Sequence, residues 1–116
     1  MGLPVHQLII ATNSNDILAR CVEIGTYGMN GVVPTYSPSM DIQVSSNFER
    51  LLFDVHGRDG KKMAQMMADF RKDKKITLSA DAHKEVKALF ASASVNDEGT
   101  LATIAEVYHR TGYVLD

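Results

Sequence analysis

The fold of this chain is indicated by one stretch near its start, Leu8-Ile9-Ile10-Ala11-Thr12-Asn13-Ser14-Asn15-Asp16. Branched apolar residues dominate its first half, within a run from His6 to Thr12, and polar turn-forming residues make up its second half. A short apolar run bounded by turn signals is typical of a buried β-strand. The sequence therefore predicts a strand that ends in a strand-to-helix turn.

A helix is expected directly after this turn. Apolar residues recur at helical spacing from Ile17 to Val22, and Gly25 is placed to end the helix. One of the polar residues at 13–15 can cap its start, because Asn and Ser are preferred N-cap types. This predicts a helix that connects the first strand to whatever follows.

A second strand is predicted from Val32 toward Thr35, after a loop at Tyr27–Asn30. Pro34 lacks a backbone donor and places this strand at a sheet edge or a strand end. A parallel pair of strands needs a connection of about a dozen residues, which residues 13–30 provide. The predicted class is therefore α/β, with two or three short parallel strands and about five helices.

Four further helices are predicted downstream. Ser46 and Glu49 have the spacing of a capping box, so the first of these helices is expected to begin at Asn47. Ser79 is expected to cap the third. The core positions expected on the last three are Met63, Met66, Met67 and Phe70; Val86, Leu89 and Phe90; and Leu101, Ile104, Ala105 and Tyr108.

The last helix is expected to be capped by Asn96 or Asp97 and to end at Gly112. The organisation predicted for residues 1–116 is a single partial domain. It comprises a strand-helix-strand unit at 5–36, a loop and helix at 37–56 that face an active site, and a helical part at 60–116. Two strands make a marginal sheet, so packing against a larger core is expected.

The composition excludes several classes of protein. With 45% hydrophobic and 22% charged residues in 116, the chain has the balance of one globular domain. A net charge of -2 gives no electrostatic reason to expect nucleic acid or a membrane as partner. Cys21 is the only cysteine, which favours a reducing compartment, and a cytoplasmic location is predicted. The four histidines are too scattered to predict a metal site.

Two groups of polar residues are expected to lie near a cleft. Asn13, Asn15 and Asp16 lie just beyond the carboxyl end of the first strand, where open α/β sheets bind ligands. The alternative for these three residues is helix capping. Ser37 and Ser39 belong to the second group, on the loop after the second predicted strand.

Asp41 lies on the same loop between Met40 and Ile42. Apolar neighbours favour a carboxylate that is held by specific partners over a solvated one. The alternative is that the carboxylate only holds the loop backbone in place. Both readings expect Asp41 to hydrogen-bond within the protein.

Ser46, Asn47 and Arg50 form a candidate anion site. Free amides at a helix start attract phosphate, and a guanidinium one turn along can pair with it. The alternative is the capping box itself, with Glu49 reaching back and Arg50 paired to a nearby carboxylate. The sequence leaves these readings open.

The run Ser37–Asp54 is more particular than a helix requires, and it resembles the threonine synthase family. Gly2–Asp16 and Thr111–Asp116 resemble the same family, in matching order. The resemblance is close over 2–24 and 33–54, looser over 55–95 and moderate over 100–116. It implies a fold-type II lyase that uses pyridoxal 5'-phosphate to convert O-phospho-L-homoserine and water into L-threonine and phosphate.

The resemblance also implies that essential parts lie elsewhere. The family's cofactor lysine and cofactor-phosphate loop have no counterpart here, so the chain is expected to be an internal fragment of the large domain. Alone it is expected to bind no cofactor and to be inactive, with no catalytic residue of its own. In the complete enzyme its partners would be the substrate and the remaining polypeptide, and the anion site would take the substrate phosphate.

A second hypothesis is a small non-catalytic interaction or regulatory α/β domain derived from the same family. The fragment hypothesis predicts an exposed strand edge and an exposed apolar patch, which a self-sufficient domain would bury. The patch is expected to include Leu8, Ile9 and Ile10, or the tail at 113–115.

Overall fold

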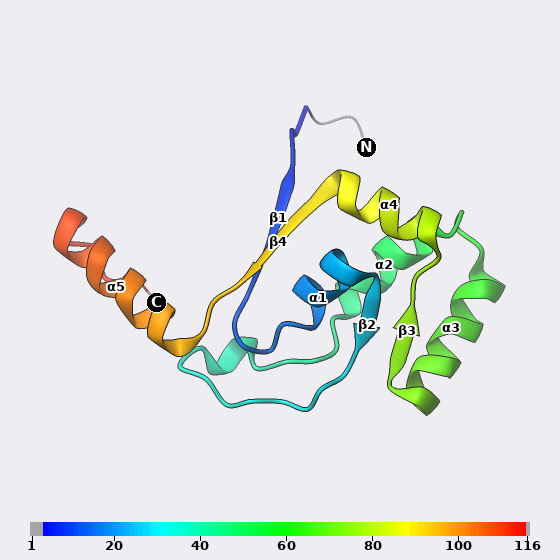
Figure 1. The fold of residues 1–116 in the computed structure, drawn as a ribbon, viewed down its shortest axis with the longest axis horizontal. Coiled ribbons are helices and arrows are strands. Elements are labelled where there is room, and N and C mark those ends of the chain that lie inside the picture. Colours follow the sequence, from blue (N-terminus) through cyan, green and yellow to red (C-terminus); the bar gives the residue numbers. More distant parts are fainter. Residues whose placement is uncertain (1–3, 116) are drawn as a thin grey trace.

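The computed structural model describes residues 4–115. Gly2, Leu3 and Asp116, which belong to the stretches that resemble the family, lie outside the described residues. The elements in chain order are β1 Leu8–Thr12, α1 Ile17–Ile24, β2 Thr26–Gly28, the 3-10 turn η1 Pro38–Met40, α2 Ser46–Val55, α3 Gly60–Asp73, β3 Lys75–Thr77, α4 Ala80–Leu89, β4 Phe90–Ser94 and α5 Asp97–Thr111 (Figure 1).

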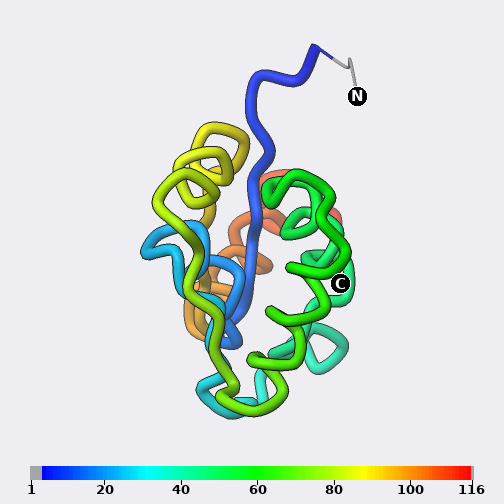
Figure 2. Tube along the Cα trace, turned by 90° about the vertical axis from the view of Figure 1, so that its right-hand side faces the viewer, coloured from blue at the N-terminus to red at the C-terminus, as the bar shows by residue number. Residues whose placement is uncertain are grey.

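The strands form two separate pairs. β1 pairs in parallel with β4, from Leu8 opposite Phe90 to Thr12 opposite Ser94. β2 and β3 form a short antiparallel pair. Viewed from the side, α4 and α3 lie on opposite sides of β1 (Figure 2). The class is therefore α/β, with a two-stranded parallel sheet and five helices within residues 4–115, as predicted.

The partner of β1 differs from the prediction. Residues 32–35 form no strand, because the Asn15 side chain occupies the backbone of Val33: Val33 N donates to Asn15 Oδ1 at 2.8 Å, and Asn15 Nδ2 donates to Val33 O at 2.8 Å. The expected loop at 27–30 instead begins inside β2. The strand-helix-strand unit at 5–36 is thus wrong in its second strand.

The part at 60–116, predicted to be helical, also contains β3 and β4. Phe90 begins a strand and does not continue α4, and Leu89 is 52% exposed. The sequence of β4, Phe90-Ala91-Ser92-Ala93-Ser94, is poor in strand-forming residues. Pairing with β1, supplied by the tertiary fold, decides its conformation.

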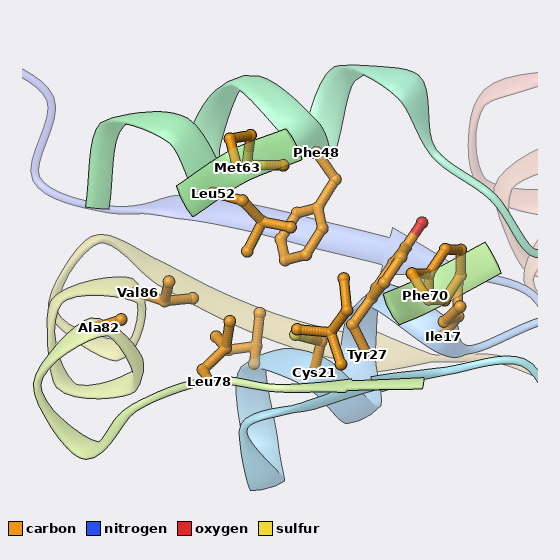
Figure 3. Close-up of a cluster of buried hydrophobic side chains, with 12 residues drawn as sticks. Ile17, Cys21, Tyr27, Phe48, Leu52, Met63, Phe70, Leu78, Ala82 and Val86 are labelled. Carbon is orange, nitrogen blue, oxygen red and sulfur yellow. The ribbon is translucent and has the colours of Figure 1, made fainter. Parts of the chain in front are cut away.

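The core lies between the helices and the two strand pairs (Figure 3). Tyr27 is at its centre, with its ring centroid 4.9 Å from that of Phe48 and 5.0 Å from that of Phe70. Met63 and Phe70 are buried, as predicted for α3. The buried cluster comprises Ile17, Cys21, Val22, Tyr27, Phe48, Leu52, Met63, Phe70, Ile76, Leu78, Ala82 and Val86.

Most predicted helix ends are confirmed. Ser79 Oγ accepts from Ala82 N at 3.3 Å, and Asn96 Oδ1 accepts from Gly99 N at 2.9 Å. Gly25 and Gly112 end their helices with φ of 72° and 74°, the left-handed conformation that favours glycine. These ends were predictable because the capping groups are close in sequence.

The predicted capping box of α2 does not form. The helix begins at Ser46 and not at Asn47, Ser45 takes the N-cap position, and no side chain caps it. Glu49 lies in the first turn, where a carboxylate complements the helix dipole without completing a box.

α5 extends away from the rest of the molecule (Figure 1). None of its residues is buried, and Leu101 and Tyr108 are 50% and 51% exposed. The prediction that Leu101, Ile104, Ala105 and Tyr108 face a core is therefore wrong within this chain. The predicted apolar exposure elsewhere is confirmed for Leu8, Ile9 and Tyr113, which are 49%, 73% and 66% exposed. It is wrong for Ile10, which packs against the core.

None of the helices in the described part of the chain has the length and apolar character needed to cross a membrane. Between residues 4 and 115, no three His, Cys, Asp or Glu side chains gather in a way that could hold a metal ion.

Candidate functional site

A cleft of about 300 Å³ lies at the carboxyl end of β1. Three parts of the chain enclose it: the β1–α1 turn, the loop between residues 37 and 45, and the start of α5. The lining residues are Ala11, Thr12, Asn13, Asn15, Ile17, Leu18, Ser37, Met40, Ile42, Ser45, Val95 and Thr100. The walls are mainly apolar, and hydroxyl and amide groups supply the polar positions.

The carboxylate of Asp41 holds the β1–α1 turn against the loop. Its Oδ1 accepts from Thr35 Oγ1 at 2.7 Å, from Asn13 Nδ2 at 2.8 Å and from Asn15 Nδ2 at 3.0 Å. Its Oδ2 accepts from Thr35 N at 2.9 Å. The structure has the hydrogen bonds that both readings of Asp41 expected: specific partners bind the carboxylate, and one of them is loop backbone.

These bonds also set the electrostatics of the site. The hydrogen bond from the Thr35 hydroxyl is the main cause that lowers the pKa of Asp41, and desolvation opposes it; the Thr35 N–H and the Asn13 amide lower the pKa further. Asp41 is therefore a carboxylate at neutral pH. The cleft lies beside a negative charge whose hydrogen-bond partners are neutral groups.

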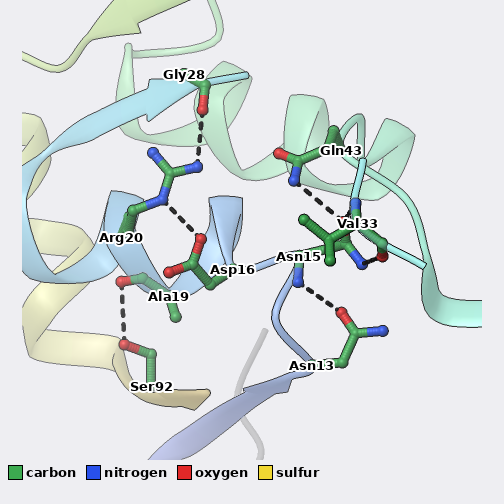
Figure 4. Close-up of polar contacts among 9 residues, drawn as sticks. All are labelled: Asn13, Asn15, Asp16, Ala19, Arg20, Gly28, Val33, Gln43 and Ser92. Carbon is green, nitrogen blue, oxygen red and sulfur yellow. Dashed lines mark hydrogen bonds and ion pairs between the residues drawn. The ribbon is translucent and has the colours of Figure 1, made fainter. Parts of the chain in front are cut away.

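Asn15 forms the second tie between turn and loop. It is 4% exposed, and besides its two bonds to Val33 its Oδ1 accepts from Gln43 Nε2 at 3.3 Å (Figure 4). Asn13 Oδ1 accepts from Asn15 N at 2.8 Å, which tightens the turn itself. The capping alternative is thus wrong for both asparagines, whose side chains fold the turn onto the loop.

Asp16 lies outside the cleft. It occupies the N-cap position of α1 but accepts no capping bond; its Oδ1 accepts from Arg20 Nε at 2.7 Å. Arg20 Nη2 also donates to Gly28 O at 3.0 Å, so the pair connects α1 to β2 (Figure 4). Geometry therefore separates Asp16 from the two asparagines beside it.

The remaining candidates divide in the same way. Ser37 lines the cleft, whereas Ser39, Ser46, Asn47 and Arg50 are exposed and do not. Arg50 Nη2 donates to Asn47 Oδ1 at 2.7 Å, so these two side chains meet on the surface of α2. Arg50 pairs with no carboxylate among residues 4–115, so that alternative is wrong for the described part of the chain.

Several residues of the site were missed from the sequence. Thr35 bonds Asn13 and Asp41, and Gln43 bonds Asn15. Tyr27 holds Ser45 through its hydroxyl. Val95 and Thr100 reach the cleft because β4 pairs with β1. No local pattern marks these residues, since each contact joins segments far apart in the chain.

Comparison with known proteins relates the chain to the threonine synthases and to proteins named threonine synthase-like 2. No family model matches it. The chain is 52% identical over 116 residues to the threonine synthase of Pseudomonas aeruginosa. The match covers all of this chain and 25% of that protein.

The fold agrees with solved structures of the same enzyme. A pyridoxal-phosphate-bound threonine synthase from Brucella melitensis matches with a TM-score of 0.95 at 48% identity, and the yeast threonine synthase with 0.93 at 35%. Both matches cover the whole chain, and 25% and 26% of the solved chains.

The cleft residues do not fit pyridoxal phosphate by themselves. The cofactor needs a lysine amine for its Schiff base and cationic or amide donors for its phosphate. Among the described residues that line the cleft there is neither a lysine nor an arginine. No step of a reaction can be assigned through the cofactor to these residues alone.

The chain spans about a quarter of the length of the relatives that it matches, and the agreement in sequence and fold extends along all of it. It is therefore related over its full length to the threonine synthases and corresponds to one segment of such an enzyme.

Proposed function

We propose that this chain forms one wall of the active-site cleft in a threonine synthase. The complete enzyme would use pyridoxal 5'-phosphate to convert O-phospho-L-homoserine and water into L-threonine and phosphate. The observation that supports this most strongly is the TM-score of 0.95 at 48% identity to the cofactor-bound Brucella enzyme. The cleft at the carboxyl end of β1 is where open α/β sheets take their ligands.

The chain's part in this reaction is to shape the site. Its cleft offers apolar walls and hydroxyl groups but no amine for a Schiff base. The remaining residues of the enzyme supply the cofactor lysine and the phosphate donors, and the isolated chain is inactive. A cytoplasmic location accompanies this function, supported by the single, buried cysteine.

A self-contained interaction domain is the weaker alternative. Such a domain would bury the faces of its own strands and helices, whereas Leu8 and Ile9 of β1 are 49% and 73% exposed. α5 likewise has no buried residue. These surfaces suit a segment that packs against a larger core.

The test is a chimeric enzyme. The matching segment of the Pseudomonas aeruginosa threonine synthase is replaced by this chain, and threonine and phosphate formation from O-phospho-L-homoserine are measured. The chimera is expected to retain activity of the same order as the parent enzyme, and the isolated chain to have none.

The control is the chimera without its cofactor lysine, which should bind substrate and make no threonine. A chimera that folds and binds the cofactor, but forms no threonine, would count against the proposed function. Turnover by the isolated chain would contradict its predicted inactivity.

A further inference from the structure

We propose that Asp41 is a positioning residue of the cleft: through Thr35 its carboxylate holds Ser37 and Met40 in the cleft wall, and it does not touch the ligand itself. This inference deepens the proposed function and rests on it.

The hydroxyl of Thr35 uses its full hydrogen-bonding capacity within the protein. Its hydroxyl carries one hydrogen, which is donated to Asp41 Oδ1. The same oxygen accepts from Asn13 Nδ2 and from Ser37 N, each at 3.0 Å. With one donated and two accepted bonds the hydroxyl is saturated, and its orientation is decided by the carboxylate.

The side chains of the two asparagines also bind within this network. Asn13 Nδ2 donates to Thr35 Oγ1 and Asp41 Oδ1, and Asn15 Nδ2 donates to Val33 O and Asp41 Oδ1. Both side-chain amide nitrogens are thus engaged with acceptors of the protein itself. The most suggestive polar residues in the sequence therefore bind one another.

Two other polar groups remain for a ligand. The hydroxyls of Ser37 and Ser45 belong to lining residues and take no part in the bonds around Asp41, whereas the Thr12 hydroxyl is buried out of reach. Ser37 is held there through its backbone, because its N–H donates to the Thr35 hydroxyl. The carboxylate thus acts on the cleft indirectly, through the Thr35 hydroxyl.

The wall depends on these bonds because it has little regular structure. Apart from the single turn Pro38–Met40, the loop from Val33 to Ser45 is irregular. Met40 N donates to Ser37 O at 2.8 Å, which connects Met40 through Ser37 to the Thr35 hydroxyl. Shifts of about 1 Å in a cleft wall can cost up to a hundredfold in rate, so loss of the bonds between Asp41 and Thr35 should lower the rate of the reaction.

The variants are chosen to separate shape from hydrogen bonding. Thr35→Val keeps the size of the side chain and removes the hydroxyl, and Thr35→Ser keeps the hydroxyl. Asp41→Asn replaces an acceptor oxygen by a donor and must lose at least one of the four bonds. Asp69→Asn is the matched control, because Asp69 accepts one amide bond from Gln65 on an exposed surface of α3.

The experiment uses the full-length chimera, with kcat and KM for O-phospho-L-homoserine and hydrogen exchange of the peptide at 33–45 as readouts. Thr35→Val and Asp41→Asn should lower kcat/KM by about ten- to a hundredfold and speed exchange in that peptide. Thr35→Ser should stay within about twofold of the parent. Asp69→Asn should match the parent in both readouts.

Two outcomes overturn the inference. Faster exchange with unchanged kcat/KM would mean that the bonds only stabilise the loop. Lower kcat/KM with unchanged exchange would mean that Asp41 contacts the ligand directly. If Asp41→Asn fails to fold, the Thr35 pair still decides between these results.

The proposed function fails separately. A folded, cofactor-binding parent chimera that makes no threonine would contradict it. The exchange readout would still report whether Asp41 and Thr35 hold the loop, and unchanged exchange in Thr35→Val would again overturn the inference.

Discussion

The hydroxyl of Tyr27 accepts a hydrogen bond of 2.9 Å from the backbone N–H of Ser45. The Tyr27 ring packs in the core between Phe48 and Phe70, and Ser45 lines the cleft. One side chain therefore connects the aromatic core to the wall of the candidate site, so core packing and cleft shape depend on each other.

Replacing Tyr27 by Phe tests this connection. The ring is kept, but Ser45 N loses its acceptor, so the free energy of unfolding should fall by about 1 to 3 kcal/mol. Chemical denaturation of the chain measures this change. Tyr108→Phe is the control, because Tyr108 is 51% exposed and should change stability by less than about 0.5 kcal/mol. Equal effects at the two positions would contradict the prediction.

Cys21 should be inert in the folded chain. Its side chain is fully buried, and burial raises the pKa of the thiol from 9.0 to about 12, against a smaller lowering by the Arg20 charge. Thiolate is the reactive form, so alkylation at mildly alkaline pH should be slow until the chain is unfolded in guanidinium chloride. Mass spectrometry after iodoacetamide treatment measures the labelled fraction. Rapid labelling without denaturant would show that the core around α1 opens readily.

At acid pH the free energy of unfolding should depend on the protonation state of Asp41. Its pKa is lowered from the ordinary value of 3.8 in the folded chain, chiefly by the Thr35 hydroxyl. A lowered pKa means that the contribution is present above 3.8 and is lost as the pH falls through the folded pKa. Unfolding experiments across this range should show wild type and Asp41→Asn converging as the pH falls. A constant difference between them would contradict the assignment.

Thr12→Val should stabilise the isolated chain. Thr12 Oγ1 is buried without a hydrogen-bond partner among the described residues, and valine removes that unsatisfied hydroxyl at nearly the same shape. The expected gain in the free energy of unfolding is about 1 kcal/mol. Thr12→Ser, which keeps the hydroxyl, should give no such gain. A loss of stability in Thr12→Val would reveal a partner for the hydroxyl.

The exposed face of α5 should matter only in the complete enzyme. Leu101 is 50% exposed, so Leu101→Lys should change the stability of the isolated chain by less than about 0.5 kcal/mol. In the chimera the same change would bury a charge or lose about 1.5 to 3 kcal/mol of apolar burial. Thermal unfolding of both proteins compares the two effects. Equal, small effects would count against packing of α5 on the rest of the enzyme.

Local chemistry made part of this structure predictable from the sequence. β1 was recognisable from its branched apolar run, and the ends of α1, α4 and α5 from Gly25, Ser79 and Asn96. The capping box of α2 had equally good spacing and does not form. Asn13 and Asn15 have the residue types of helix caps but bind the loop instead, because their partners lie 18 to 28 residues away.

The sequence by itself thus determined the α/β class, the position of most helices and the place where polar residues meet the end of β1. Only the tertiary structure decided that Phe90–Ser94 pairs with β1, that Val33 binds a side chain in place of a strand, and that Asp41 collects its four bonds. The physical reason is distance along the chain. Capping and apolar spacing act over a few residues, whereas strand pairing and buried hydrogen bonds depend on which distant groups the fold brings together.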